Sequence, residues 1–354
     1  MELIELSRTA IIIILGAIGL AAFGIIFGLL YKGFDRKISA HMQGRIGPPI
    51  RQPFRDVSKL FVKENIVPEN AIPWVFNLAP LIGLVATISI LLYLPIAGFQ
   101  PLLDGVISTK GDLILILYLL IIPSLAMVIG GFASGSPYAT VGAQREMATM
   151  IAYEFPLAII IISFAFRLYV QQAGNVFTLS TITATPIWGI VGPLGFIGAI
   201  ILLLALVIVT PAELSKIPFD APEAETEIAG GLLTEYSGRN LAMFYLTDGV
   251  KTVVMASLIV ALFFPYNLSP VFGLKEIPAF AIDIVFYLIK VLLVIVFSVT
   301  LIRVAIARLK INQIVYTYWV WITLIALFGL ILLMWDQTVM TQLSWQPLLK
   351  MLGI

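Results

Sequence analysis

Residues 168–212 read LYVQQAGNVFTLSTITATPIWGIVGPLGFIGAIILLLALVIVTPA and contain no charged side chain. An α-helix needs about 20 apolar residues to cross the hydrocarbon core of a bilayer, so this stretch is too long for one span. The polar, Thr-rich segment QQAGNVFTLSTITATP at 171–186 divides it into the end of one predicted span and most of the next. The pattern therefore predicts several membrane-spanning helices joined by polar segments.

The composition of the whole chain agrees with this interpretation. Of its 354 residues, 60% are hydrophobic and 12% are charged, whereas soluble domains have about 25% charged residues. The net charge of +1 gives no indication of nucleic-acid binding. Because the chain has no Cys and a single His, His41, we expect no thiolate metal site, iron–sulfur cluster or disulfide in it. The first apolar segment is too long for a signal peptide and is read as a retained span.

Eight apolar segments are long enough to cross a membrane, so we predict an all-α polytopic membrane protein that forms one membrane domain over residues 1–354. The predicted spans cover about 9–31, 74–94, 112–133, 151–169, 188–210, 244–264, 282–302 and 314–335.

The distribution of positive charge predicts the orientation of these spans. The loops after spans 1, 3, 5 and 7 carry fourteen Lys and Arg residues, and the opposite side carries four. The positive-inside rule therefore places the odd-numbered loops in the cytoplasm and both termini on the outer side of a cell membrane. Loops 1, 3 and 5 hold nearly all the unusual sequence, and we expect them to be large cytoplasmic loops.

Loop 1 combines a rigid turn region with an amphipathic segment. Its Gly and Pro residues between 44 and 53 predict a non-helical turn. The following RDVSKLFVKENI at 55–66 places Val57, Leu60 and Phe61 on one helical face, which is typical of an interfacial helix. The alternative is a basic loop that contacts anionic lipid headgroups.

Loop 3 and the start of span 4 bring two carboxylates onto one helical face. Glu146, Met150 and Glu154 are spaced four apart. Glu154 is expected inside the membrane boundary, where a carboxylate normally faces a bundle interior or a water path. The alternative is that Glu154 is simply paired near the headgroups.

Loop 5 contains PFDAPEAETEIAGGLLTEYSG at 218–238, a concentration of acidic residues in an otherwise apolar chain. Glu223 and Glu227 are four apart and are predicted to share a face, with Glu225 pointing elsewhere. Such a run is usually a solvated acidic loop, but here the carboxylates alternate with Pro, Ala, Ile and Leu. We therefore expect packed carboxylates, which need partners, and the basic loop 1 is their expected source.

Further ionisable residues lie within the predicted spans. Asp248 and Lys251 are three apart on span 6, a spacing that allows them to pair. Asp283 and Lys290 lie seven apart on span 7. Arg167 is expected to snorkel to the outer surface. Buried groups of this kind are what proton or ion conduction needs, because they can exchange charge in a medium of low dielectric constant.

Three stretches resemble the cytoplasmic signature segments of the respiratory complex I subunit 1 family, the NuoH type. They are GRIGPP…QPFRDVSKLFVKE at 44–64, YATVGAQREMATMIAYE at 138–154 and AELSKIPFDAPEAETEIAGGLLTEYSG at 212–238. The resemblance extends over the whole chain. It implies a subunit that anchors a peripheral redox arm to the membrane, with a chamber at the junction and buried carboxylates that begin a polar path into the membrane.

The resemblance also assigns roles to residues of this chain. The positions matching the chamber or the partner contact are Arg45, Gln52, Asp56, Lys59 and Arg145, with which we group the loop 5 cations Lys216 and Arg239. The matching carboxylates of the path are Glu146, Glu154, Glu213, Asp220, Glu223, Glu225, Glu227 and Glu235. We add the membrane-embedded residues Asp248, Lys251, Asp283 and Lys290 to this path.

Departures from the respiratory pattern favour one branch of the family. Respiratory members typically read like LAEYAN where this chain has LTDGVK at 246–251. QREMATMIAYE and EYSGRNLA are more similar to the anchor subunits of energy-converting membrane-bound [NiFe]-hydrogenases and sulfane sulfur reductase-type complexes. This similarity favours a hydrogenase-like complex over a quinone-binding subunit of an NADH:quinone oxidoreductase.

The resulting hypothesis is a non-catalytic anchor and coupling subunit of a redox-driven H⁺ or Na⁺ pump. We expect no cofactor on this chain. Iron–sulfur clusters and a nickel–iron centre would belong to partner subunits, namely an iron–sulfur subunit and a hydrogenase-large-subunit-like protein, and antiporter-like subunits would adjoin in the membrane. Three alternatives stay open: a quinone-binding subunit of an NADH:quinone oxidoreductase, a stand-alone transporter, which leaves the long loops unexplained, and a purely structural anchor with no ion path.

Overall fold

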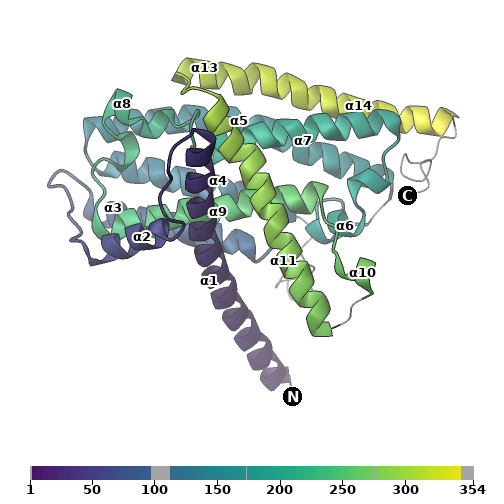
Figure 1. The fold of residues 1–354 in the computed structure, drawn as a ribbon, viewed down its shortest axis with the longest axis horizontal. Coiled ribbons are helices and arrows are strands. Elements are labelled where there is room, and N and C mark those ends of the chain that lie inside the picture. Colours follow the sequence, from purple (N-terminus) through teal and green to yellow (C-terminus); the bar gives the residue numbers. More distant parts are fainter. Residues whose placement is uncertain (1, 97–111, 173, 274–275, 344–354) are drawn as a thin grey trace.

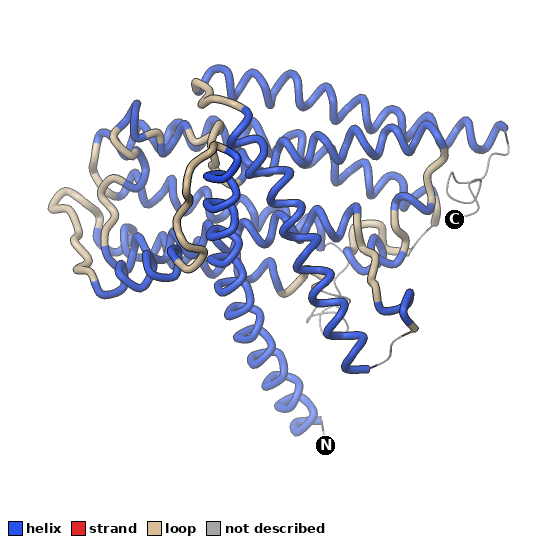
Figure 2. Tube along the Cα trace, in the orientation of Figure 1, coloured by secondary structure: helices blue, strands red, loops and turns tan. Residues whose placement is uncertain are grey.

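The computed structural model describes residues 2–96, 112–172, 174–273 and 276–343 (Figure 1). Every regular element in these ranges is helical (Figure 2). Eight helices within them are long and apolar enough to cross a membrane, and each coincides with one predicted span. The prediction of an all-α polytopic protein is therefore confirmed for the described part of the chain.

Six of the eight candidate spans are single helices: α1 (Glu2–Met42), α3 (Pro73–Leu91), α4 (Asp112–Ala133), α5 (Pro137–Val170), α7 (Pro193–Glu213) and α9 (Gly238–Phe263). The seventh runs through α11 (Glu276–Ile295), the π-helical turn η4 (Val296–Thr300) and α12 (Leu301–Ala305). The eighth runs through α13 (Ile311–Tyr316), the π-helical turn η5 (Thr317–Ile322) and α14 (Thr323–Leu343).

Short helices lie in the connections: α2 (Gln52–Val62), α6 (Leu179–Ala184), η1 (Ile187–Gly189), η2 (Ala221–Glu223), α8 (Glu225–Ile228), η3 (Gly231–Leu233) and α10 (Ser269–Phe272). Helix α9 is at the centre of the bundle: 94% of its most apolar stretch is buried, against 17% for α1. It packs against α1, α3 and α11. Helices α5, α7 and α14 run side by side on one flank, and the N-terminal part of α1 projects from the bundle (Figure 1).

Two helices are longer than the sequence predicted. Helix α1 continues to Met42, so Lys32, Asp35 and Arg36 are helical rather than part of loop 1. Helix α5 begins at Pro137, so the predicted loop 3 is helical from that residue on. Proline is tolerated in the first turn of a helix because its missing N–H would have no intrahelical partner there. At 1.5 Å per residue, α5 is about 51 Å long and exceeds the hydrocarbon thickness of about 30 Å.

Loop 1 carries the predicted amphipathic helix as α2. Phe54 and Val57 pack with Leu29 of α1 and Leu246 of α9, so Val57 faces the protein. Phe61 is 53% exposed, and its place on the face of an interfacial helix stays a prediction. The helix is thus anchored by its first half only.

Loop 5 is fixed to α5 through a close backbone approach. A Cβ on Gly142 would lie 2.7 Å from the Leu232 nitrogen and 2.9 Å from the Pro222 oxygen. Backbone atoms on both sides of the acidic segment therefore touch α5 directly. This contact brings the carboxylates of loop 5 beside Arg145 and Glu146, one turn further along the same helix.

Candidate functional site

A cavity of about 380 Å³ lies among α1, α9, η4 and the segment that follows α7. Apolar side chains, including Pro123, Met127 and Phe244, form part of its wall. The rest of the wall is charged, and we call this space the charged cavity. Its six cationic side chains are Lys32, Arg36, Lys216, Lys251, Arg303 and Arg308, and its six acidic side chains are Asp35, Glu213, Asp220, Glu223, Glu225 and Asp248.

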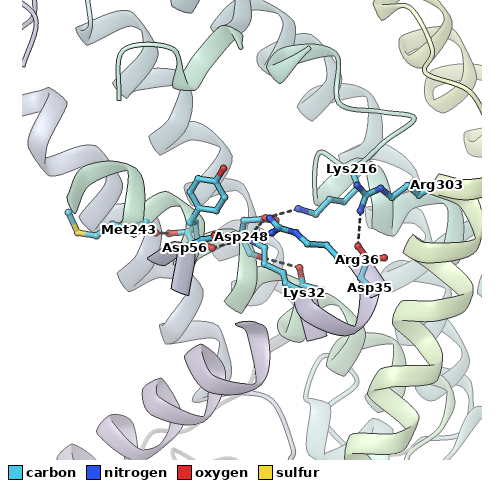
Figure 3. A network of polar contacts seen from close by, with 11 residues as sticks. Lys32, Asp35, Arg36, Asp56, Lys216, Met243, Asp248 and Arg303 are labelled. Carbon is cyan, nitrogen blue, oxygen red and sulfur yellow. Dashed lines mark hydrogen bonds and ion pairs between the residues drawn. The ribbon is translucent and has the colours of Figure 1, made fainter. Parts of the chain in front are cut away.

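Asp248 joins three segments of the chain in this cavity. Its Oδ2 accepts hydrogen bonds from the ammonium groups of Lys32 and Lys216, each at 2.6 Å (Figure 3). Lys32 also donates to the Tyr245 carbonyl at 2.9 Å. One carboxylate between two ammonium groups connects α1, loop 5 and α9 electrostatically.

Two further charge clusters border this triad. Asp35 accepts hydrogen bonds from Thr300 of η4 at 2.7 Å and from Arg303 at 2.9 Å. Arg36 donates to Asp56 at 3.1 Å, and Gln52 donates to the other oxygen of Asp56 at 2.8 Å. Gln52 and Asp56 thus lie beside the cavity residue Arg36 without lining the cavity, and their role in a chamber or partner contact stays a prediction.

Two of the loop 5 carboxylates have cationic partners, but loop 1 does not supply them. Asp220 receives two hydrogen bonds from Arg308, at 2.9 and 2.5 Å. Glu227 pairs with Arg145 of α5, whose guanidinium also donates to the Ala221 carbonyl at 3.3 Å. The expectation that loop 1 provides the cations was wrong, because α5 and the connection after α12 lie closer to loop 5.

The predicted common face of Glu223 and Glu227 is also absent. Glu223 ends η2, Ala224 is extended, and Glu227 belongs to the separate helix α8. Prolines at 218 and 222 break this segment into short turns. Glu223 consequently faces the charged cavity, Glu225 is exposed at the edge of the cavity, and Glu227 is exposed on the surface.

Glu223 is the acidic group of the cavity most ready to titrate near neutral pH. Burial and, to a smaller extent, the nearby Asp248 carboxylate raise its pKa to about 7 against the opposing effect of Lys216. Within the described residues Glu223 has no ion pair. A carboxyl group in this state can accept or release a proton in response to a change in charge nearby.

A second buried pair lies deeper in the bundle. Lys251 of α9 contacts Glu213, the last residue of α7, at 2.8 Å, with the two side chains 5% and 2% exposed. The Lys251 ammonium also donates to Ser124 of α4 at 3.0 Å. The predicted pairing of Asp248 with Lys251 was therefore wrong, because each residue has a closer partner on another segment.

Glu146 and Glu154 of α5 continue this cluster. Glu146 is 1% exposed and accepts a hydrogen bond from Ser215 at 3.5 Å, while its other oxygen is buried without a partner in the described structure. One oxygen of Glu154 is likewise buried without a hydrogen-bond partner in the described structure. Glu154 and Glu213 both line a second cavity of about 220 Å³ between α4 and α5, which we call the lateral cavity.

The structure does not bring Asp283 and Lys290 into this cluster. Asp283 accepts hydrogen bonds from the Leu268 and Ser269 backbone and so caps α10. Lys290 donates to the carbonyls of Phe264 and Tyr266, at 2.9 and 2.7 Å, just after α9 ends. Both residues tie α11 to the segment at the far end of α9, and neither lines the charged cavity.

The remaining predicted contact residues lie on the surface. Arg45, Lys59 and Arg239 are exposed, and Glu235 is partly exposed. Arg45 donates to Gln43 in the turn region of loop 1 at 2.9 Å. These residues belong to the outer surface around loops 1 and 5 and do not line the cavity.

Arg167 is buried rather than snorkelling. It is 0% exposed and pairs with Asp336 of α14 at 3.2 Å. It also donates to Gln337 at 2.8 Å, and Asp336 accepts from the Gly192 backbone at 2.9 Å. Asp336 lies one position beyond the predicted end of span 8. The apolar sequence around it gave no indication that it pairs with Arg167.

Five charged residues of the cavity were not among the predicted site residues: Lys32, Asp35, Arg36, Arg303 and Arg308. Four of them were counted only as positive charges of the odd-numbered loops. The available signal was their position directly at the ends of apolar segments, where a charged side chain can reach the neighbouring loop. Asp35 has the same signal, since it lies between Lys32 and Arg36 on one helix.

In the described ranges no group of three or more His, Cys, Asp or Glu side chains could hold a metal ion. The charged groups do not surround an obvious nucleophile either. They extend from the surface of loop 5 through the charged cavity to carboxylates buried among α4, α5 and α7. This fold and this arrangement define a polytopic membrane protein with charged groups in its interior.

Comparison with known proteins identifies the family. The NADH dehydrogenase family model matches residues 15–334, and the chain belongs to this family. It is 33% identical to an NADH-quinone oxidoreductase subunit of Brevibacillus brevis, covering 84% of this chain and 85% of the relative. It is 35% identical to hydrogenase-4 component C of Escherichia coli, covering 76% of this chain and 80% of the relative.

A solved structure shows the same fold. A chain in the structure of the membrane-bound sulfane sulfur reductase, an archaeal respiratory membrane complex, superposes with a TM-score of 0.75 at 27% identity. The match covers 91% of this chain and 99% of that chain. The resemblance seen in the three signature segments is thus confirmed, and the chain is a membrane subunit of the complex I-like or hydrogenase-like type.

Proposed function

We propose that this chain couples electron transfer in a peripheral redox arm to ion translocation across the membrane, within a hydrogenase-like complex. The chain itself carries no redox group in this proposal. Its partners are an iron–sulfur subunit and a hydrogenase-large-subunit-like protein at loops 1 and 5, and antiporter-like subunits in the membrane. Reduction in the partner changes the charge near loop 5, and the charged cavity passes that change inward.

The observation that supports coupling is the continuity of charge between surface and membrane interior. Arg145 and Glu227 lie at the exposed end, the Asp248 triad lies in the cavity, and Lys251 with Glu213 lies at its inner end. Neighbouring charges interact strongly when water is scarce, since Coulomb energy scales inversely with the dielectric constant. A change at loop 5 can therefore alter the protonation of groups deeper in the bundle.

The proposed orientation follows from the charge bias of the sequence. The exposed basic residues of loop 1 and the acidic turns of loop 5 lie on the cytoplasmic side of the cell membrane, facing the redox arm, and both termini lie outside. A stand-alone transporter would not need this surface. The bacterial relatives are named as a subunit and a component of larger enzymes, which supports a place for this chain in a multi-subunit complex.

The test replaces Glu223, the cavity carboxyl that can titrate near neutral pH. Glu223→Gln keeps the shape of the side chain but removes its exchangeable proton. We expect the purified complex in proteoliposomes to keep electron transfer while ion pumping, driven by reduced ferredoxin or NADH, is lost. Glu69→Gln is the matched control, because Glu69 is exposed on loop 1 and does not line the cavity.

Two results would overturn the proposal. Parental pumping in the Glu223→Gln complex would show that this carboxyl is not part of the coupling route. Equal loss of pumping in the Glu69→Gln complex would show that the effect is not specific to the cavity.

Quinone binding is the second candidate, and the apolar part of the cavity wall favours it. Pro123, Met127, Leu233, Phe244, Ile295 and Val299 could contact a quinone ring. The twelve charged side chains around them are a poor match for a neutral ring and its isoprenoid tail. We therefore expect turnover of the complex in quinone-free lipid to be unchanged. Labelling of the cavity by a photoreactive quinone, together with quinone-dependent turnover, would favour the respiratory role.

A further inference from the structure

The charged cavity and the lateral cavity have one titratable residue in common. Glu213 lines both, whereas Lys251 lines the first and Glu154 the second. Among the described residues, Glu213 is therefore the titratable side chain that connects the two cavities directly. The pair between Glu213 and Lys251 lies at this point, with both side chains almost completely buried.

Three helices contribute oxygen atoms to the group around the Lys251 ammonium, two of them in direct contact with it. Glu213 of α7 lies at 2.8 Å and Ser124 of α4 at 3.0 Å, and Ser124 is 3.3 Å from the Tyr153 hydroxyl of α5. Glu146 of α5 accepts from Ser215, two residues after Glu213, and its second oxygen is buried without a partner in the described residues. Carboxylate and hydroxyl oxygens are the ligands that hard cations such as Na⁺ prefer.

We infer that the Lys251 ammonium is a built-in cation that occupies this group of oxygens, excludes Na⁺ from it and makes the step through Glu213 a proton transfer. The inference rests on the proposed ion path and specifies which ion can pass at this position. Na⁺ could bind Glu213 only by displacing a tethered positive charge at 2.8 Å. A proton needs no such space.

The proton step follows from the same geometry. A proton arriving from the charged cavity converts the Glu213 carboxylate to the neutral acid, which weakens its attraction to Lys251. The neutral carboxyl group can then donate that proton to the ionised Glu154 carboxylate across the lateral cavity. Glu213 returns to the anion and pairs again with Lys251. No charge other than the proton is transferred.

The experiment uses the intact complex and a carbodiimide, dicyclohexylcarbodiimide, which adds to protonated carboxyl groups in apolar surroundings. Peptide mass spectrometry locates the adduct on Glu213 or Glu154, and labelling is compared with and without NaCl. In the parental protein we expect Na⁺ to give no protection. In Lys251→Ala the oxygens lose their cation, and we expect NaCl to lower labelling at these residues several-fold.

Lys251→Arg is the matched variant, since it keeps the charge and should remain insensitive to Na⁺. Protection of the parental Glu213 or Glu154 by Na⁺ would overturn the inference, because the site would then be open to Na⁺. Equal labelling of Lys251→Ala with and without NaCl would overturn it as well, since the vacated oxygens would not form a cation site. Neither result depends on whether Glu223→Gln still pumps, so the two proposals can fail separately.

Discussion

The buried pair between Arg167 and Asp336 gives a prediction whose size can be worked out from the structure. The closest nitrogen and oxygen are 3.2 Å apart, and both side chains are 1% exposed. With an effective dielectric constant of about 20, their attraction is about 5 kcal/mol. Asp336→Asn keeps the shape of the side chain and an oxygen that can accept from the Gly192 backbone, so it removes mainly the negative charge.

Other contacts of Arg167 offset part of the attraction energy that Asp336→Asn removes. Arg167 also donates to Gln337 and to the Ile190 carbonyl, and these contacts continue to solvate the guanidinium group. Breaking a buried pair typically costs about 3–5 kcal/mol, so we expect a loss of about 3 kcal/mol of stability for Asp336→Asn. At a few degrees per kcal/mol, the melting temperature of the detergent-solubilised complex should fall by at least about 5 °C.

An exposed pair of the same chemistry is the control. Arg36 and Asp56 are 3.1 Å apart with side chains 35% and 36% exposed, and exposed pairs contribute about 0–1 kcal/mol. Thermal scans monitored by size-exclusion chromatography should therefore show almost no change for Asp56→Asn. If Asp336→Asn melted within about 1 °C of the parent, or no lower than Asp56→Asn, the assignment of a stabilising buried pair would be refuted.

Three further changes test other parts of the site. Asp248→Asn leaves the ammonium groups of Lys32 and Lys216 facing each other, so the number of ions pumped per electron should fall at least several-fold in proteoliposomes, whereas Asp248→Glu should retain most of it. Parental stoichiometry in Asp248→Asn would contradict this role. Gly142→Ala pushes a methyl group against the backbone of loop 5 and should cost about 1–3 kcal/mol in thermal stability. Gly189→Ala, with open space around its Cβ, should cost much less, and equal losses would argue against the close contact. Because the Glu223 pKa is raised to about 7, this group stabilises the native protein at low pH and loses that effect as the pH rises through about 7. The melting temperature should therefore fall less steeply between about pH 5 and pH 8 in Glu223→Gln than in the parent, and parallel curves would count against the raised pKa.

The spans were predictable from sequence because each one is a run of apolar residues long enough to cross a bilayer. Their ends were less predictable. Lys32, Asp35 and Arg36 look like the start of a basic loop, yet they continue α1 because their side chains enter the charged cavity. A charge at the end of an apolar run does not distinguish a loop from a helix that turns toward a polar interior.

The pairing of charges was less predictable still. Spacing along a helix predicted that Asp248 would bind Lys251, but Lys216 and Glu213 approach them from other segments. Local spacing carries no information about such neighbours. Arg167 and Asp336 are separated by most of the C-terminal half of the chain, and only the packing of α5 against α14 brings them together.

The resulting pairs divide the acidic residues into two kinds. Asp220 and Glu227 each have an arginine within contact distance, which holds the side chain in place. Glu223 and the two α5 carboxylates, Glu146 and Glu154, have no ion pair within the described residues. Glu213 lies between these two kinds, because it is paired with Lys251 and the proposed proton step requires this pair to weaken and form again. The three unpaired acids and Glu213 are therefore the groups proposed to carry charge, and the paired Asp220 and Glu227 contribute to the electric field around them.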